Sequence, residues 1–434
     1  MTANDNTAPL VESFERGGAD LPGGWLSPVR GAAIRDFAEA GFPTPRTESW
    51  KYTNLGRLTR KDFDPLADVP AVDAAAWTDL FVDGCDRIVV VNGRYDAANS
   101  VVGALPDGVV LAPLSEAVEG AADFLTHIAQ SEDAPLVALN TAFMRDGLVL
   151  RVPRGTVLER PVQIVHIVDG GGTALSVHPR TLVVAEEGAE ATVIETFAGS
   201  GEAGYWTNAV TEIRVGANAR IRHVKRQSEA LTGFHTAVTQ ARLDRDARYG
   251  VSALATGATL SRNEIRVSFE GEGAECEMSG AALLRGRQHA DTTTLADHRV
   301  PHTDCRQVFR NVADGHARVV FQGGVTVRQD AQKTDSSQSS RSLLLAAGAQ
   351  ADAKPELRIF ADDVKCAHGA TVGDLDRAAL FYLESRGVPP AEARALLIRA
   401  FVGEVLETVP EGAVRDHLDG AIAAWMDNDG GEND

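Results

Sequence analysis

The sequence predicts a mainly β fold, with a stacked β-solenoid at its centre and helical regions before and after it. From about 147 to 373, short alternating apolar runs are separated by small residues, with little helical periodicity. One unit recurs there: an apolar run, a Gly or Asp turn, a small residue and a second apolar run. Its copies are "LVVAEEGAEATVIE" (182–195), "EIRVGANARIRHV" (212–224), "ARLDRDARYGVSA" (241–253) and "RVSFEGEGAECEM" (266–278).

The spacing of these copies favours a solenoid. The alanines after each turn, Ala189, Ala217, Ala247 and Ala274, are 28, 30 and 27 residues apart. A repeat of about 28 residues suits one or two coils of a β-solenoid, in which each unit buries its face only against its neighbours. A β-sandwich with frequent glycine turns remains the alternative.

The N-terminal part mixes helices and strands. A helical pattern covers about 28–40, and Gly41, Pro43 and Pro45 then force an extended segment. Strands are predicted at 88–92 and 147–152, and helical pieces near 115–131 and 135–143.

Helical periodicity returns after residue 373. The expected helices cover 374–387, 389–410, which begins at a proline, and about 411–426, together forming a small bundle. We therefore expect a disordered N-terminus (1–25), a mixed domain (26–146), the solenoid core (147–373), a C-terminal helical domain (374–427) and an acidic tail (428–434).

Composition limits the classes of partner. The 434 residues carry a net charge of −19, which argues against a nucleic-acid backbone or an anionic membrane. The N-terminal stretch has no secretory pattern, and no apolar run is long enough to span a bilayer. The four scattered cysteines are expected to be reduced thiols in a cytoplasmic protein.

Familiar catalytic motifs are absent from the sequence. It contains no "GxxxxGK[ST]", no "GxSxG" and no complete glycine-rich dinucleotide fingerprint. A group at 289–305 (His289, His298, His302 and Cys305) has metal-binding side chains, but its spacing matches no trusted zinc pattern, so core or surface histidines are the favoured interpretation. We expect Cys85 and Cys276 to be small buried side chains.

"ADDVKCAHGAT" (361–371) places a thiol and an imidazole two residues apart, at Cys366 and His368. On a strand, such residues face the same side and can meet one ion or one partner surface. Two ligands cannot complete a tetrahedral site, which needs four. The pair is half of a metal site, a nucleophile with its base, or two ordinary strand residues.

The stretch "AQKTDSSQSSRSLLL" (331–345) packs polar residues ahead of three leucines. Polar ladders of this kind can run along solenoid turns. An edge strand also exposes backbone groups that can pair with another chain. We expect the segment 321–345 to form edge strands of this kind.

Several ordered stretches resemble the SufB/SufD family of iron–sulfur cluster assembly proteins. They are "PTPRTESWKYTNL" (43–55), "FQGGVTVRQDAQKTDSSQSSRSLLL" (321–345), "PELRIFADDVKCAHGATVGDLD" (355–376) and "LFYLESRGV" (380–388). "KCAHGATVG" is similar to the SufD branch, because SufB-like chains carry a glutamate where this chain has Gly369.

The resemblance implies a right-handed parallel β-helix and no enzymatic activity of the chain itself. It also implies a heterodimer with a SufB-like subunit through the β-helices, and docking of the C-terminal helices on a SufC-like ATPase. A homodimer without SufB remains an alternative. The nascent iron–sulfur cluster would form at the heterodimer interface, with His368 as a ligand and Cys366 either ligating or packing. Association of the family complex with reduced flavin is also implied, with no site readable in this sequence.

Overall fold

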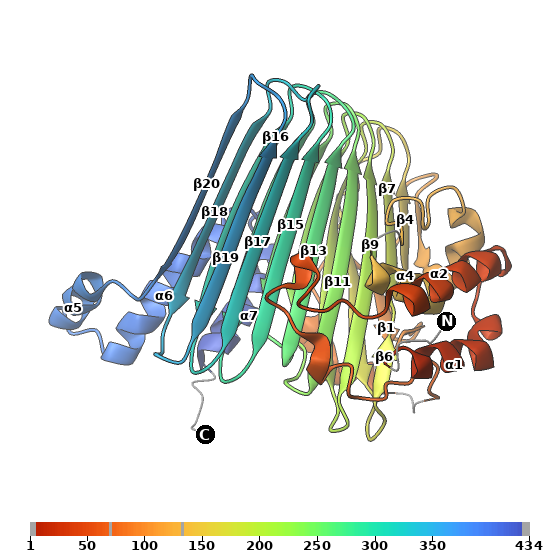
Figure 1. The fold of residues 1–434 in the computed structure, drawn as a ribbon, viewed down its shortest axis with the longest axis horizontal. Helices are drawn as coiled ribbons and strands as arrows, with labels where there is room; N and C mark the ends of the chain where they lie inside the picture. The colour runs from red at the N-terminus through yellow and green to blue at the C-terminus, as the bar shows by residue number, and fades with distance from the viewer. Residues whose placement is uncertain (1–5, 69–71, 132–133, 428–434) are drawn as a thin grey trace.

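The computed structural model describes residues 6–68, 72–131 and 134–427 (Figure 1). Two ten-stranded sheets form the body. The first sheet contains, in spatial order, β2 (Arg94–Tyr95), β1 (Asp86–Val91), β5 (Val162–Asp169), β8 (Glu190–Ser200), β10 (Arg220–Gln227), β12 (Arg248–Ala255), β14 (Glu275–Leu284), β16 (Asp304–Ala313), β18 (Asp335–Leu344) and β20 (Lys365–Gly373). The second contains β19 (Gln350–Ile359), β17 (Arg318–Val327), β15 (His289–His298), β13 (Leu260–Phe269), β11 (Gly233–Leu243), β9 (Tyr205–Val215), β7 (Arg180–Ala185), β4 (Gly147–Val152) and β3 (Val110–Pro113), and β6 (Leu175–Val177) pairs with β9.

Successive strands alternate between the two sheets, so one coil contributes one strand to each. The ladders from β4 to β20 are parallel and in register; Arg220 lies opposite Arg248, and Arg248 opposite Glu275. The predicted parallel β-solenoid is therefore confirmed, and the β-sandwich alternative is wrong. The repeat seen in the sequence corresponds to one two-strand coil.

A column of left-handed residues turns the chain into the strands of the first sheet from β8 to β18. Their φ angles lie between +55° and +74°, in a region where glycine, asparagine and aspartate are favoured. The column consists of Gly188, Asn218, Asp246, Gly273, His302 and Lys333. A small buried residue follows each one: Ala189, Ala219, Ala247, Ala274, Thr303 and Thr334. The stacked alanine of the second repeat is thus Ala219; Ala217, expected from the sequence, lies before the left-handed Asn218.

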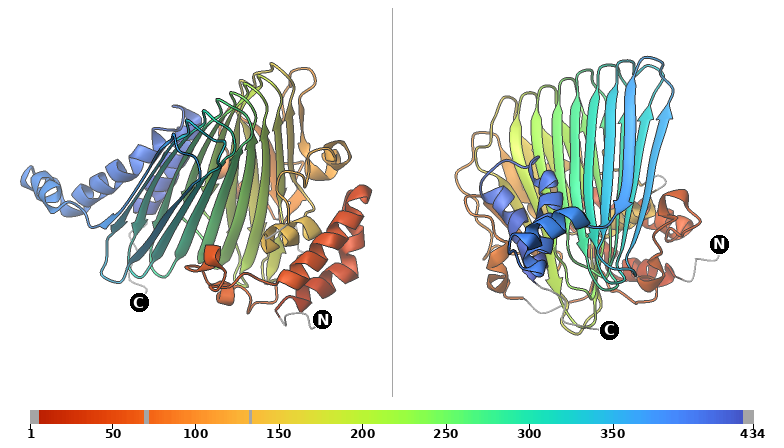
Figure 2. Two further views of the ribbon diagram at one scale, coloured as in Figure 1. Left: turned by 45° about the horizontal axis from the view of Figure 1, so that its top comes forward. Right: turned by 90° about the vertical axis from the view of Figure 1, so that its left-hand side faces the viewer.

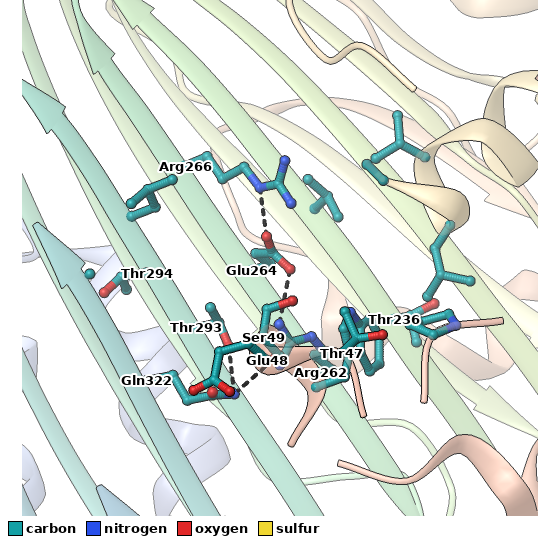
Figure 3. Close-up of a pocket in the computed structure, with 18 of the residues that line it drawn as sticks. Thr47, Glu48, Ser49, Thr236, Arg262, Glu264, Arg266, Thr293, Thr294 and Gln322 are labelled. Carbon is teal, nitrogen blue, oxygen red and sulfur yellow. Dashed lines mark hydrogen bonds and ion pairs between the residues drawn. The ribbon is translucent and has the colours of Figure 1, made fainter. Parts of the chain in front are cut away.

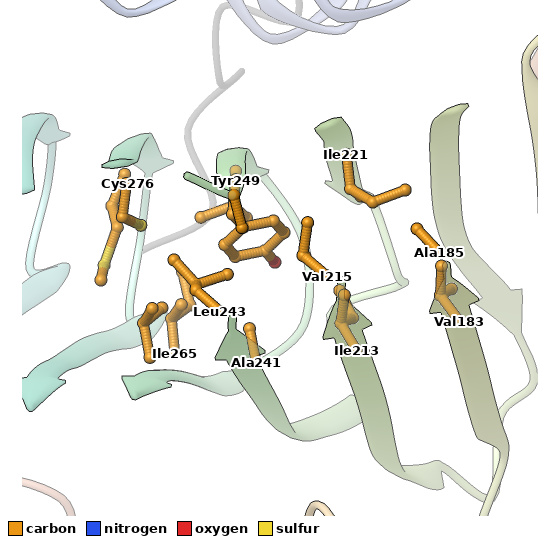
Figure 4. Close-up of a cluster of buried hydrophobic side chains, with 14 of the residues drawn as sticks. Val183, Ala185, Ile213, Val215, Ile221, Ala241, Leu243, Tyr249, Ile265 and Cys276 are labelled. Atoms are coloured by element: carbon orange, nitrogen blue, oxygen red, sulfur yellow. The ribbon is translucent and has the colours of Figure 1, made fainter. Parts of the chain in front are cut away.

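Alternate residues of each strand point into the tube, where apolar side chains from both sheets interdigitate. Figure 4 shows part of this core, with Ile213, Leu243 and Ile265 on one wall and Ile221 and Tyr249 on the other. Each coil covers the apolar face of the coil before it, which is the physical basis of the solenoid.

The N-terminal helices cover the second sheet near its first coils (Figures 1 and 2). They are α1 (Ala8–Gly17), α2 (Ser27–Ala40), α3 (Leu114–Ala117) and α4 (Pro135–Phe143), and the 3₁₀ segments of the chain are 18–20, 24–26, 48–50, 55–57, 74–80 and 118–121. Phe37 and Leu139 pack against Trp206 and Phe234 of the sheet. The buried Glu212 accepts hydrogen bonds from Arg180 and from three backbone amides near residue 128, which fixes this region on β9.

Part of the N-terminus differs from the expectation of disorder over 1–25. Residues 1–5 lie outside the described residues, but α1 follows directly after them. Leu10 of α1 is buried in the same cluster as Phe37, and the Ser13 hydroxyl bonds Asp64. Burial of one helix face against α2 and the sheet supplies the order that composition did not reveal.

The extended segment after α2 crosses the outer face of the second sheet. Trp50 stacks on the guanidinium of Arg262, and Gln322 donates to the carbonyl oxygen of Ser49 at 3.1 Å. Glu48 pairs with Lys354 of β19. The proline-rich stretch is therefore an ordered strap that reaches the last coil.

Three C-terminal helices follow β20: α5 (Arg377–Ser385), α6 (Pro390–Leu406) and α7 (Ala413–Asp427). The second and third lie on the outer face of the first sheet (Figure 2), where Val402 and Leu418 share a core with Val224 and Leu254. Arg310 of β16 also holds Glu404 through two hydrogen bonds of 2.8 and 2.7 Å. The apolar faces of α6 and α7 are therefore buried against the first sheet as well as against each other. The acidic tail (428–434) lies outside the described residues.

The free edges of the solenoid are not where the sequence suggested. Segment 321–345 corresponds to β17 and β18, and each is hydrogen-bonded on both sides. Two further strands, β19 and β20, end the two sheets. The expectation that 321–345 forms edge strands is wrong, because one more coil follows it. Within the described ranges, no helix is long and apolar enough to cross a membrane.

Candidate functional site

Cys366 and His368 lie together on β20, at the open end of the tube. In register, Cys366 lies opposite Ser336 and His368 opposite Gln338, and both of these β18 residues point into the interior. The two site residues therefore face the same, inward side of the last coil. Because no further coil covers them, Cys366 is half-buried and His368 is exposed.

The thiol packs against the end of the apolar core. Burial raises the pKa of Cys366, and the negative charge of Asp335 raises it further. A metal ion bound there would have to displace the thiol proton, because the thiolate is the ligand form. His368 can coordinate as a neutral imidazole.

A polar layer lies directly beneath this pair. Ser336, Gln338 and Ser340 of β18 are buried, and their side-chain oxygens and the amide nitrogen have no hydrogen-bond partner within the described chain. The Gln338 amide reaches across to β17, where a methyl group placed on Gly323 would lie 3.0 Å from its nitrogen. The end of the tube therefore offers hydrogen-bonding groups that the chain does not satisfy.

The site is incomplete within this chain. Among the described residues, no three His, Cys, Asp or Glu side chains are arranged to hold a metal ion. An apolar rim accompanies the pair, since Ile359, Phe360 and Val372 are exposed at the same end. A thiol and an imidazole beside exposed apolar groups suit a site that a second molecule completes.

The histidines of 289–305 do not meet. His289 bonds the hydroxyl of Thr53 in the strap. His298 lies inside the tube and stacks on Phe269, with ring centroids 4.2 Å apart. His302 is the exposed left-handed turn residue. The favoured interpretation as core and surface histidines agrees with these positions.

A buried charged group deep in the tube was missed from the sequence. Glu195 accepts hydrogen bonds from His223 at 2.8 Å and from Thr181 and Thr211 across the interior, and Lys225 lies 3.9 Å away. Burial alone would raise the pKa of Glu195, but the His223 hydrogen bond and the Lys225 charge hold it below its usual range. Alternation relative to the inward Ala191 and Val193 could have revealed that Glu195 points inward.

The strap and the second sheet enclose a cavity of about 760 Å³ (Figure 3). Its cations are already paired: Arg262 with Asp291, Arg266 with Glu264 at 2.6 Å, and Lys354 with Glu48. A flavin nucleotide would need cations or free amides for its phosphates. The residues that line this cavity therefore do not fit a flavin nucleotide.

The C-terminal helices present a second exposed surface. No residue of α5 is buried, and Figure 1 shows this helix extending away from the body. Phe381 and Tyr382 are 71% and 57% exposed, and Leu396 of α6 is 46% exposed. Large exposed apolar side chains on adjoining helices are typical of a protein-binding surface.

These features define a β-solenoid protein with an incomplete thiol–imidazole site at one end and an exposed apolar helix beside it. Comparison of the sequence with known families agrees. The family described as "SUF system FeS cluster assembly, SufBD core domain" matches residues 166–401, and "SufBD protein N-terminal region" matches 23–164. The chain belongs to the SufBD family of iron–sulfur cluster assembly proteins.

Individual relatives match over most of their length. The chain is 33% identical to an iron–sulfur cluster assembly SufBD family protein of Synechocystis, over 87% of this chain and 86% of that protein. It is 30% identical to iron–sulfur cluster assembly protein SufD of Escherichia coli, over 90% and 91%. The SufD of Bacillus subtilis is 27% identical, over 91% and 92%.

Proposed function

We propose that this chain is the SufD-type scaffold subunit of a SUF iron–sulfur cluster assembly complex. In this proposal it pairs with a SufB-like subunit through the open end of its solenoid and docks a SufC-like ATPase through its C-terminal helices. It works in the cytoplasm and hydrolyses no nucleotide itself. The observation that carries the proposal is the inward-facing Cys366 and His368 on the last, uncovered coil.

The pair contributes to the site where the nascent cluster forms. His368 supplies a neutral imidazole ligand to iron, and the partner supplies the remaining ligands, mainly thiolates. Cys366 either adds a thiolate or packs beside the ligand. Its raised pKa means that ligation would cost the release of a proton, which favours His368 as the ligand.

Reconstitution of the complex tests these roles. The chain is co-expressed with its SufB-like and SufC-like partners, and iron, sulfide and visible absorption are measured after anaerobic cluster assembly. We expect His368→Ala to retain the complex and lose the cluster. Cys366→Ala should be mild if the thiol only packs and equally severe if it ligates. A His368→Ala complex with a wild-type cluster would remove the residue from the mechanism.

The SufB-like partner is proposed to pair with the free edge of β20. Lys365 donates its backbone N–H to the carbonyl oxygen of Thr334, directly before the start of β18. Because residues of a strand alternate sides, the N–H of Ala370 points to the free edge. Ala370→Pro removes this donor without removing a bond to β18. We expect lost heterodimer on size exclusion with a folded chain, whereas the Ala370→Ser control should still pair.

An unaffected heterodimer in Ala370→Pro would refute pairing through this strand. The same measurement on the chain alone addresses the alternative of a homodimer. If a homodimer forms through the same edge, Ala370→Pro should convert it to monomers as well.

The ATPase is proposed to bind the apolar surface of α5. Replacing Phe381 and Tyr382 by serine removes exposed apolar area while leaving the buried helices α6 and α7 unchanged. We expect at least tenfold weaker ATPase binding in pull-down or calorimetry, with the heterodimer retained. As a matched control, Arg377→Ser changes an exposed residue of the same helix and should leave binding nearly unchanged. Unchanged binding of the double variant would exclude this surface.

A further inference from the structure

Two of the four cysteines face each other inside the tube. Cys276 of β14 and Cys305 of β16 are 29 residues apart and directly opposite in the parallel ladder. Both belong to the apolar core and are 4% and 3% exposed. Figure 4 shows Cys276 on the same wall of the core as Tyr249, one strand further along the sheet. All four cysteines are free thiols in the structure.

The backbone geometry of this pair suits a disulfide. Residues directly opposite on neighbouring strands have Cα atoms about 4.8 Å apart. Disulfides require Cα separations of about 4.4–6.8 Å with both side chains directed to the same space. Cys276 and Cys305 meet both conditions, because they occupy the same inward position in consecutive coils.

The surroundings distinguish the two thiols. The neighbouring Cys276 thiol and then the His298 imidazole lower the pKa of Cys305 to about 6, although burial opposes this. Burial raises the pKa of Cys276. Gln307 directs its amide N–H₂ at the Cys305 sulfur, 3.9 Å away. His298 Nε2 is buried and has no hydrogen-bond partner within the described chain, so it is free to act on a neighbouring group.

The outer face of the same strands is open to solvent. A surface cavity of about 810 Å³ runs along the start of the strands of the first sheet, and Cys276 and Cys305 are among the residues that line it. The hydrogen-bonded ladder of β14 and β16 separates this cavity from the two thiols, which point into the tube. A peroxide therefore reaches the thiols when these coils open locally.

We propose that Cys276 and Cys305 form a thiol-modification site in which a peroxide oxidises Cys305 and the neighbouring Cys276 resolves it to an intramolecular disulfide. The Cys305 thiolate attacks one peroxide oxygen, the O–O bond breaks, and Cys305 becomes a sulfenic acid while the other oxygen leaves as hydroxide and is protonated to water. The Cys276 sulfur then attacks the Cys305 sulfur, and the sulfenic oxygen leaves as water. Two thiols and one hydrogen peroxide give one disulfide and two waters.

Oxidation of the native chain tests this site. In a Cys85→Ala/Cys366→Ser background only Cys276 and Cys305 remain. The folded protein is treated with hydrogen peroxide, quenched with catalase, denatured in iodoacetamide and analysed by intact mass and peptide mapping. We expect a monomer that has lost two hydrogens, takes up no label and yields a linked pair of peptides. The native chain should form the linked pair on the order of tenfold faster than the urea-unfolded chain, because the fold holds the two sulfurs side by side although the residues are 29 positions apart.

Single substitutions separate the two roles. With Cys276→Ser, peroxide should leave Cys305 as a sulfenic acid that dimedone traps; with Cys305→Ser, Cys276 should stay unmodified. The same peptide map on the wild-type chain needs no substitution and guards against a variant that misfolds. The proposal is overturned if both thiols stay free in the native chain under conditions that oxidise the unfolded chain. It is equally overturned if Cys276 and Cys305 react at equal rates in the single variants.

Discussion

His223 and His368 occupy the same inward position of the coil, His223 on β10 in an early coil and His368 on β20 in the last coil of the tube. The column passes from His223 through Val251, Met278, Gln307 and Gln338 to His368, one coil at a time, and each residue lies in direct register with the next. His223 is fully buried and bonds both Glu195 and Tyr249. His368 is exposed, above a layer with unsatisfied polar groups.

The difference follows from position in the stack. In the early coils, coils on both sides shield inward-pointing polar groups from water. Such groups are tolerated only where the chain itself supplies hydrogen-bond partners, as it does for Glu195. At the last coil, inward-pointing polar groups are not covered by another coil, so a partner chain or a ligand can still bond to them. The same architecture therefore produces a closed hydrogen-bonded layer in an early coil and leaves a candidate binding site at the last coil.

The largest loss of stability is expected from a substitution in the buried hydrogen-bonded group around Glu195. Glu195→Gln removes the carboxylate and leaves the buried Lys225 without its counter-charge. Loss of one partner from a buried pair should lower the free energy of unfolding by about 3–5 kcal/mol, measured by urea titration. Glu190→Gln, on the same strand but in an exposed ion pair, is the matched control and should change little. Similar small losses in both variants would show that the buried layer is not stabilising.

Acid should destabilise the same end of the tube. Burial lowers the pKa of His166 to about 4, from an unfolded value near 6.5. Between these values the unfolded chain binds a proton that the folded chain does not, so stability is complete above pH 6.5 and falls as pH drops toward 4. The loss should be about 3 kcal/mol for this residue. Urea titrations from pH 7 to 4 measure it, and His166→Gln should reduce the slope by about one proton; an unchanged slope would assign the acid effect elsewhere.

At the open end, we expect replacement of a buried polar side chain by an apolar one to raise the free energy of unfolding, whereas the same change deeper in the tube should lower it. Gln307 and Gln338 are neighbours in the column. Gln307 accepts a hydrogen bond from Thr294 at 2.7 Å, whereas the Gln338 amide has no hydrogen-bond partner among the described residues. Gln338→Met removes unsatisfied buried groups and should stabilise the isolated chain by about 1 kcal/mol, whereas Gln307→Met should destabilise it by a similar amount. Urea unfolding of both variants decides the matter; destabilisation by Gln338→Met would mean that its amide is satisfied.

Much of the fold could be predicted from the sequence, because the solenoid repeat is local. Turn residues such as Asp246 and Gly273 recur with the apolar runs and mark each coil. The repeat length alone did not fix which residues align, so Ala217 was placed in the column that Ala219 occupies. The edge strands were placed one coil too early for a similar reason, since nothing local in 331–345 shows that another coil covers it.

The candidate site was partly predictable. The spacing of Cys366 and His368 places both on one face of a strand, and β20 has this arrangement. The contact of Cys276 with Cys305 was not foreseen, because it depends on register between residues 29 positions apart. Ordered packing of 6–25 was not foreseen either, since it depends on a tertiary partner for α1.

The smallest effect on stability is expected at the candidate site, for a substitution of His368. His368→Ala removes a ring that is exposed on the last coil and covers no other layer, so the urea midpoint should stay at the wild-type value. His223→Ala, at the same position of an early coil, leaves Glu195 and Tyr249 without their partner and should lower the midpoint clearly. If the two alanine variants unfold at the same urea concentration, the ends of the tube do not differ as proposed. If only His223→Ala is destabilised, the identity of His368 cannot be explained by folding and has to be explained by what binds at the open end.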